Sequence, residues 1–243
     1  MGTSRGTKRA LLLGLITLSL LAGCKAGAAP NAGFIQHPEW MVKPKLLPFH
    51  GAWAKPNLAW DDYTEILIAP VDTQHLLDSE WWQKRFFHDR QKDSERVAKE
   101  LHERLEKAFA EDENHRYTVV QEAGSKTLIF ELAIVELIPT SVTGNLVGYG
   151  ASILIPGGGL IRTFTKGSMA YEARLRDSAT QEVVVTFKDR EWMKFSIFNV
   201  DDFSYFRFAD EIMDEWCQQF VSIANLGMDT RVKDSKAYKL RPW

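Results

Sequence analysis

The chain has 243 residues, of which 45% are hydrophobic and 26% are charged. This composition is typical of a globular protein and excludes intrinsic disorder, because disordered chains combine low hydrophobicity with high net charge. The formal net charge of -2 argues against nucleic-acid binding, which needs a strongly basic surface. Two cysteines are too few for a small disulfide-stapled domain.

Residues 1–23 predict a secretory signal peptide. Basic residues precede an apolar run from Ala10 to Ala22, which is shorter than the roughly 20 residues of a membrane-spanning helix. The run ends in Leu21-Ala22-Gly23-Cys24, which resembles the lipobox of bacterial lipoproteins. This resemblance implies cleavage before Cys24, acylation of that residue and a lipid anchor in a membrane.

The residue after the predicted anchor bears on its location. In other bacterial lipoproteins an Asp at this position commonly retains the protein at the inner membrane, whereas this chain has Lys25. The resemblance therefore implies the periplasmic leaflet of the outer membrane. Several acyl chains on one residue would make the attachment effectively permanent, since each buried CH₂ contributes roughly 0.8 kcal/mol.

Two stretches of different character follow the anchor. Residues 24–33 are rich in Ala, Gly, Pro and Asn, which predicts a flexible tether. Residues 34–62 combine prolines with many large apolar side chains, which predicts an extended arm that lacks regular structure and packs along the domain. The alternative for this arm is an apolar surface that waits for a partner.

The first half of the predicted domain, residues 63–226, reads as strand, helix, strand. An apolar run over Glu65–Val71 predicts a buried strand, and apolar positions spaced by three and four over 90–110 predict an amphipathic helix. Two further strands are expected at 117–120 and Thr127–Ile138. This order implies a crossover connection and parallel pairing.

The second half predicts a hairpin and a last helix. Alternation over Ser168–Arg176 predicts a strand with one buried and one solvated face, paired with Val183–Phe187. A helix over 202–224 carries Cys217 on its apolar face, where a small core residue is a better interpretation than a nucleophile. Residues 227–243 predict a solvated basic tail. The expected fold is α+β or α/β, with a mixed sheet of about five strands, two main helices packed on it and the N-terminal extended arm.

These features together resemble an uncharacterised family of Gram-negative lipoproteins, domain of unknown function 3313. The resemblance rests on the lipobox, on Gly33-Phe34-Ile35, on the strands at 63–71 and 167–177, on the turn at 177–182 and on Asp189-Arg190. It implies no established activity. One departure is Gln181, where the family usually has Gly. Because a left-handed conformation costs Gln roughly 1 kcal/mol relative to Gly, we expect this turn to be built differently.

Residues 141–166 form an unusual segment between the two halves. The segment contains six glycines and many aliphatic residues but no acid, and long loops of this kind are often functional. Three interpretations stay open: it folds over its own sheet, contacts a partner, or contacts the membrane. The candidate contact residues are Leu146, Val147, Tyr149, Ile153, Leu154, Ile155, Leu160 and Ile161.

The sequence shows no recognisable catalytic or metal site. The six histidines lack metal-binding spacing, and the pairs Asp61-Asp62 and Asp201-Asp202 are typical of turns and caps. We therefore predict a non-catalytic interaction or envelope-assembly module without cofactor or metal, which contacts the membrane through Cys24 and either an envelope protein or a second copy of itself. The alternatives are an envelope hydrolase, which predicts a pocket with convergent polar groups, and an apolar-ligand carrier, which predicts a hydrophobic cavity.

Overall fold

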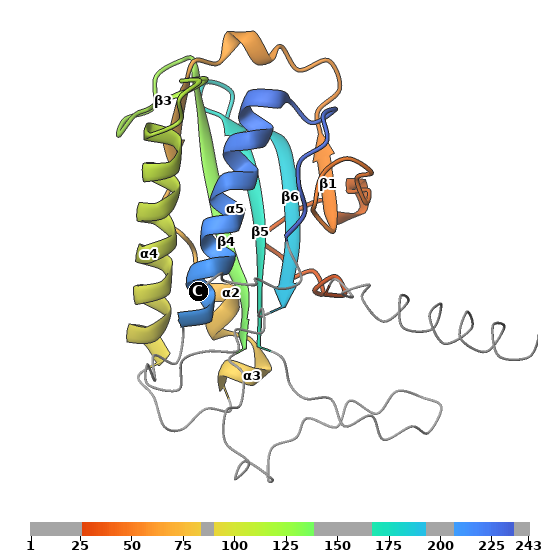
Figure 1. Cartoon of the computed structure of the whole chain (residues 1–243), viewed down its shortest axis with the longest axis vertical. Coiled ribbons are helices and arrows are strands. Elements are labelled where there is room, and N and C mark those ends of the chain that lie inside the picture. Colours follow the sequence, from red (N-terminus) through yellow and green to blue (C-terminus); the bar gives the residue numbers. More distant parts are fainter. Residues whose placement is uncertain (1–25, 84–89, 139–166, 193–206, 236–243) are drawn as a thin grey trace, which may run out of the picture.

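The computed structural model describes residues 26–83, 90–138, 167–192 and 207–235, which form a mixed six-stranded sheet with two long helices on one face (Figure 1). The elements are η2 (Pro38–Trp40), β1 (Gly51–Ala54), η3 (Trp60–Asp62), β2 (Glu65–Ile68), α2 (Gln74–Leu77), α3 (Glu80–Gln83), α4 (Arg90–Ala110), β3 (Thr118–Val119), β4 (Thr127–Ile138), β5 (Ser168–Asp177), β6 (Val183–Trp192) and α5 (Arg207–Leu226). The α+β fold with a mixed sheet and two main helices is confirmed.

The strand order is β1-β6-β5-β4-β2-β3. β2 pairs in parallel with both β3 and β4, so the predicted crossover is present. β4, β5 and β6 form an antiparallel meander, and β1 adds to the free edge of β6. β1 comes from the stretch at 34–62 that we expected to lack regular structure. That expectation was wrong because Gly51–Ala54 is free of proline and finds an open strand edge beside it.

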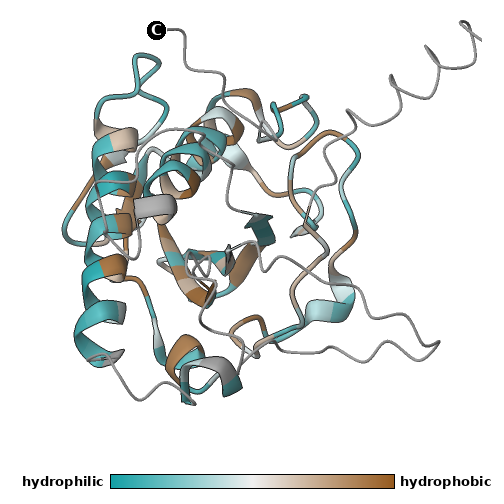
Figure 2. Cartoon of the chain, turned by 60° about the horizontal axis from the view of Figure 1, so that its bottom comes forward, coloured by the Kyte–Doolittle hydropathy of each residue, from teal (hydrophilic) through white to brown (hydrophobic). Residues whose placement is uncertain are grey.

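The main core lies between the sheet and the helix pair α4 and α5. Val97, Leu101 and Leu105 on α4 are fully buried, and Trp216 and Phe220 on α5 lie against the aromatic residues of the sheet. Figure 2 shows α4 as mostly hydrophilic with short hydrophobic patches, as expected for an amphipathic helix with one solvated side. The predicted helix periodicity therefore corresponds to the face that packs on the sheet.

The opposite face of the sheet is also covered, although the alternation in β5 predicted that it would be solvated. Ala170 is fully buried and Glu172 is 2% exposed. The cover comes from Ala29, Ala32 and Phe34, which pack against a small cluster on this face. The prediction was wrong because a strand pattern cannot show that a distant segment lies across the strand.

The turn between β5 and β6 adopts the left-handed conformation despite its glutamine. Gln181 has a φ of 62°, so the expectation of a differently built turn was wrong. Asp177 accepts hydrogen bonds from the backbone N–H groups of Ala179 (2.8 Å) and Thr180 (2.7 Å), and the Gln181 amide donates to the carbonyl of Ser178 (2.7 Å). These side-chain contacts offset the conformational cost that glycine would avoid.

The stretch after α5 is not wholly solvated as predicted. Val232 is buried in the main core, and its backbone N–H donates to the carbonyl of Leu46 at 3.0 Å. The residues that follow α5 therefore contact the N-terminal part of the chain, and the remaining tail residues, 236–243, lie outside the described residues.

Candidate functional site

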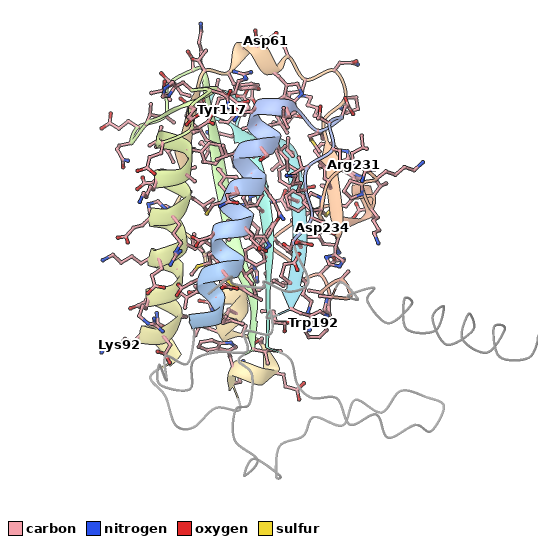
Figure 3. All side chains as sticks on the ribbon, in the orientation of Figure 1. Asp61, Lys92, Tyr117, Trp192, Arg231 and Asp234 are labelled. Carbon is pink, nitrogen blue, oxygen red and sulfur yellow. The ribbon has the colours of Figure 1, made fainter. Side chains whose placement is uncertain are left out.

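The sequence-predicted site residues lie outside the described residues. These are Cys24 and the eight candidate contact residues Leu146, Val147, Tyr149, Ile153, Leu154, Ile155, Leu160 and Ile161. The structure does describe the strand ends that come before and after the eight candidate contact residues. Ile138 pairs with Ser168, and Ser168 pairs with Trp192, so β4 ends, β5 begins and β6 ends at the same end of the sheet. We call this end of the sheet the latch end; Figure 3 labels Trp192 there.

Ala26, the first described residue, is already part of the domain. It is 4% exposed, and its carbonyl accepts a hydrogen bond of 2.6 Å from Nε2 of His50. Nδ1 of the same imidazole lies 2.5 Å from Oδ1 of Asp189, whose side chain is fully buried. The ring of His50 therefore joins the start of the described chain to the last part of β6.

A second set of contacts holds the next residues to the sheet. The buried carboxylate of Glu172 accepts hydrogen bonds from the backbone N–H groups of Ala32 (2.7 Å) and Ile35 (3.1 Å). The Arg174 guanidinium lies 4.4 Å from the ring centroid of Phe34 and donates to its carbonyl at 3.0 Å. We call residues 26–35, together with His50, Glu172 and Arg174, the N-terminal latch.

The latch differs from the flexible tether that we expected at 24–33. Over its described part, this stretch is hydrogen-bonded and partly buried against the sheet. Composition suggested a tether because small residues and glycine give the backbone no preference for one conformation. Small side chains also allow the backbone to approach a sheet closely. The available signal was Glu172, which follows the apolar run Met169–Tyr171 in its strand, since a buried acid requires partners.

Part of the 34–62 stretch presents aromatic side chains to solvent. The His37 and Trp40 rings stack at 4.0 Å between centroids, and Trp40 lies 5.1 Å from Trp53 on β1. Trp40 is 49% exposed and Val42 is 67% exposed. We call these four residues the aromatic patch. The burial of Leu47 and Phe49 in the main core supports an arm that packs along the domain. The exposed Trp40 and Val42 support an apolar surface that waits for a partner.

A cavity of about 260 Å³ lies at the other end of the sheet, which we call the cavity end. It opens between the sheet, the last residues of α4 and the end of α5, and Figure 3 labels Asp61 and Tyr117 in this region. Its lining is mainly apolar: Trp60, Ile66, Phe109, Tyr117, Leu128, Phe130, Leu175, Phe187, Phe220, Ile223, Ala224, Leu226, Gly227 and Met228. Polar lining comes from Asp61, Arg116 and Asn225.

The polar groups of the cavity end are partly engaged with one another. Arg116 donates through its two Nη atoms to the carbonyls of Tyr63 (3.0 Å) and Trp60 (2.8 Å), which fixes the η3 turn over the cavity. Asn225 donates from its amide nitrogen to Asp112 at 2.9 Å. Its amide oxygen is buried without a hydrogen-bond partner among the described residues. Asp61 lies in η3, which agrees with the turn role predicted for the acid pair.

Two buried groups between the sheet and α5, the Tyr171 hydroxyl and the Cys217 thiol, have strongly raised pKa values. Burial, together with the nearby Asp189 and Glu191, raises the pKa of Tyr171 well above its ordinary value of 10.0. Burial raises the pKa of the Cys217 thiol to about 12. Both side chains therefore stay protonated and neutral at physiological pH. Cys217 is buried in the main core, as the sequence predicted.

Neither a metal cluster nor a membrane span is found within the described ranges. In this part of the chain no three His, Cys, Asp or Glu side chains converge as metal ligands would. Its helices are too short or too polar to cross a bilayer.

The described residues thus define an α+β domain that carries a latch at one end and an apolar cavity at the other. The chain belongs to the family described as "Protein of unknown function (DUF3313)", whose model matches residues 45–220. No curated protein sequence matches the chain.

Solved structures show a weaker likeness. PelC from Paraburkholderia phytofirmans, solved as the dodecamer of a point variant, is 8% identical, with 74% of this chain and 96% of that chain covered and a TM-score of 0.32. A Xanthomonas campestris protein of family DUF330 is 12% identical, with 71% and 94% covered and a TM-score of 0.35. A neuraminyllactose-binding hemagglutinin homologue from Helicobacter pylori is 13% identical, with 76% and 89% covered and a TM-score of 0.26. At such scores the likeness carries no argument about function.

Proposed function

We propose that this chain is an outer-membrane lipoprotein whose periplasmic domain acts without catalysis as an interaction or assembly module. The N-terminal latch is the observation that carries this proposal. Ala26 is buried only two residues after Cys24, and two residues span at most about 7 Å. Acyl chains on Cys24 would therefore hold the latch end of the sheet close to the lipid surface.

The aromatic patch supports a role in protein contact. Tryptophan side chains are enriched at the centres of protein interfaces, and Trp40 is nearly half exposed beside the edge strand β1. On a domain held at the membrane, this patch would meet an envelope protein or a second copy of the chain. The segment at 141–166 remains part of the proposal, because the strands before and after it, β4 and β5, end and begin at the latch end.

The anchor is tested by mass spectrometry of the full-length protein isolated from Gram-negative membranes. We expect a mature N-terminus at Cys24 that carries a diacylglycerol and an amide-linked acyl chain. The Cys24→Ser variant should lose the lipid and leave the membrane fraction, whereas the matched Cys217→Ser variant should keep both. An unmodified Cys24, or a signal peptide still attached, would overturn the proposal.

The contact surface is tested by chemical crosslinking in cells. Trp40→Ala and Val42→Ala should weaken the crosslinked species, whereas Leu226→Ala should not, since Leu226 is 54% exposed at the cavity end. Deletion of 146–161 tests the second candidate surface in the same assay. If the crosslinked species persist unchanged in every variant, neither surface is the interface.

A second candidate function is that of an apolar-ligand carrier, and the cavity is the observation that favours it. The cavity is lined mainly by aliphatic and aromatic groups. An envelope hydrolase finds less support, because Tyr171 and Cys217, whose pKa values are strongly raised, do not line the cavity.

A further inference from the structure

We propose that the cavity binds an aliphatic molecule with one anionic head, a carboxylate or a phosphate, and that the guanidinium of Arg116 receives this head. The inference rests on the second candidate function and adds the charge and the size of the ligand. Two observations carry it. The cavity has an apolar lining, and that lining includes an arginine whose ion-pair partner among the described residues, Asp61, is fully exposed.

The aliphatic body of the ligand follows from the walls of the cavity. Phe109 on α4, Phe130 on β4 and Ile223 on α5 come from three different elements and line the same space. Burial of carbon against such walls is favourable in proportion to the apolar area removed from water. The volume of about 260 Å³ holds roughly nine groups of about 30 Å³, which is the volume of one water molecule in the liquid and close to that of a methylene group. A chain of about eight carbons therefore fits.

Arg116 is held in the cavity lining by neutral groups. Its two Nη atoms donate to the carbonyls of Tyr63 (3.0 Å) and Trp60 (2.8 Å), and its guanidinium carbon lies 4.6 Å from the ring centroid of Tyr117. Carbonyl groups and an aromatic ring stabilise the guanidinium but do not neutralise its charge. Because its position is already fixed, little conformational entropy is lost when an anion binds to it.

The guanidinium of Arg116 is open to a ligand. Its side chain is 27% exposed and lines the cavity. A guanidinium has five N–H donors, and the hydrogen bonds to Tyr63 and Trp60 are the ones that it makes among the described residues. A carboxylate or a phosphate accepts from the other donors through two oxygens, which is the geometry that arginine recognises best.

The ion-pair partner of Arg116 does not close this site. A carboxylate oxygen of Asp61 lies 3.7 Å from Nη2 of Arg116, beyond hydrogen-bond distance, and the Asp61 side chain is fully exposed. Exposed ion pairs contribute little, because water and salt screen their charges. An anionic head that is partly withdrawn from water is screened less, so it competes successfully with Asp61 for the guanidinium.

The test uses the full-length protein in phospholipid vesicles and an octanoate with a photoreactive diazirine on its chain, with the labelled peptides identified by mass spectrometry. We expect label on the peptide that contains Ile223 and Met228, which line the cavity. Four competitors of equal chain length are compared at equal concentration in the membrane: octanoate, octyl phosphate, 1-octanol and octylammonium. The better of the two anions should compete at about tenfold lower concentration than 1-octanol, the effect of a hydrogen bond to a charged group, and it identifies the head as carboxylate or phosphate.

Charge variants at the cavity end test the role of Arg116. Arg116→Gln should remove the preference for an anion over 1-octanol, and Arg116→Lys, which keeps the charge, should retain most of it. Asp61→Asn should increase the preference about twofold, because it removes the competing carboxylate. The matched Asp62→Asn lies in the same turn outside the cavity lining and should leave the preference unchanged. Both acids are exposed, so these two variants test the proposal even if Arg116→Gln fails to fold.

Two phenylalanine variants locate the site. Ala224→Phe places a large side chain in the cavity lining and should reduce the labelling about tenfold or more, whereas Ala110→Phe puts the same side chain on an exposed position of α4 outside the lining and should leave it unchanged. Circular dichroism shows whether each variant is folded.

The outcomes separate this inference from the function on which it rests. Absence of specific label at the cavity, or equal loss of label in both phenylalanine variants, would overturn both the carrier and its anionic ligand. Label that Ala224→Phe abolishes, but that 1-octanol or octylammonium displaces as well as the two anions do, would leave a carrier of apolar molecules and overturn the anionic head. An anion preference that persists in a folded Arg116→Gln variant would overturn the role of Arg116.

Discussion

The latch end and the cavity end of the sheet bury opposite kinds of chemistry. At the latch end, His50 lies beside the buried Asp189, and Glu172 holds the N-terminal residues against the sheet. At the cavity end, carbon atoms of the sheet and of both long helices surround space that they do not fill. The comparison teaches that a buried polar group is costly unless it has a hydrogen-bond partner, whereas apolar side chains can border an unfilled cavity without such a partner.

The last turns of α5 and the residues that follow them form one wall of the cavity. The helix ends at Leu226, and Gly227 follows with a φ of 77° and an N–H that donates to the carbonyl of Ile223 at 2.8 Å. This is a common glycine C-cap, which turns the chain away from the helix axis. Ile223 and Leu226 in the last turns of α5 line the cavity together with Leu175 and Phe187 of the sheet.

The largest effect is expected from the loss of His50 at the latch end. His50→Ala removes a close partner of the buried carboxyl group of Asp189 and the donor to Ala26, so it should lower the free energy of unfolding by about 3 kcal/mol. Urea denaturation measures the change. The matched control is His102→Ala, since the His102 imidazole contacts the carbonyl of Ala69 after β2 and the partly exposed Glu106, and neither is a buried carboxyl group. If both variants lose the same free energy of unfolding, the contacts of His50 in the latch are no more stabilising than those of a partly exposed histidine.

Glu172→Ala should have the next largest effect. It deprives the backbone N–H groups of Ala32 and Ile35 of their acceptor and should cost about 2 kcal/mol, the range for hydrogen bonds to charged groups. Amide hydrogen exchange gives the sharper measurement, because these two amides should exchange faster while those of α4 stay unchanged. If their exchange does not accelerate, Glu172 does not hold the latch.

At the cavity end, Tyr63→Phe should cost about 1 kcal/mol at neutral pH and change the response to acid. The Tyr63 hydroxyl donates to Asp177 at 2.6 Å and lowers the pKa of that carboxyl below its ordinary value of 3.8. A lowered folded-state pKa adds stability that is complete above the ordinary value and is lost as the pH falls through the lowered one. The variant should therefore lose less stability below about pH 4 than the unaltered chain.

The measurement for Tyr63→Phe is the free energy of unfolding as a function of pH between neutral and strongly acidic solution. Tyr117→Phe serves as the control, since Tyr117 is another tyrosine at the cavity end and does not bond Asp177. An unchanged acid profile in Tyr63→Phe would show that this hydrogen bond does not set the pKa of Asp177.

The smallest effect is expected in the turn between β5 and β6. Gln181→Gly relieves a left-handed conformation but loses the hydrogen bond to Ser178, so it should stabilise the protein by about 0.5 kcal/mol. Gly227→Ala is the counterpart: an added Cβ meets nothing within 4 Å, so its cost of about 1 kcal/mol comes from the positive φ alone. Thermal unfolding compares the two, and a destabilised Gln181→Gly would mean that the side-chain contact dominates.

Much of the fold could be predicted from the sequence, because it depends on contacts between residues that are near in sequence or periodic. The helix α4 was expected at 90–110 and is found there, and the strand β4 was expected and found at Thr127–Ile138. Helix periodicity and strand alternation follow from the geometry of the backbone, so they can be read without knowledge of the neighbours. The predicted burial of Cys217 rests on the same reasoning and is confirmed.

The candidate sites could not be predicted in this way. The latch joins Ala32 to Glu172 and Ala26 to His50, and its partners are as many as 140 positions apart in the sequence. The cavity combines Arg116 with Asn225 from opposite halves of the chain. None of these residues belongs to a recognisable motif, and the acid Glu172 within an apolar strand is a signal that a partner is needed but does not say which segment supplies it.

The sequence by itself determined the class of fold, the elements and the lipobox resemblance at Cys24, because each follows from local spacing and residue type. Only the tertiary structure decided that Glu172 is buried beneath the N-terminal residues, that 34–62 contributes a strand, and that a cavity lies beside the last turns of α5. The physical reason is that backbone periodicity is local, whereas burial and empty volume depend on which distant segments meet across the sheet.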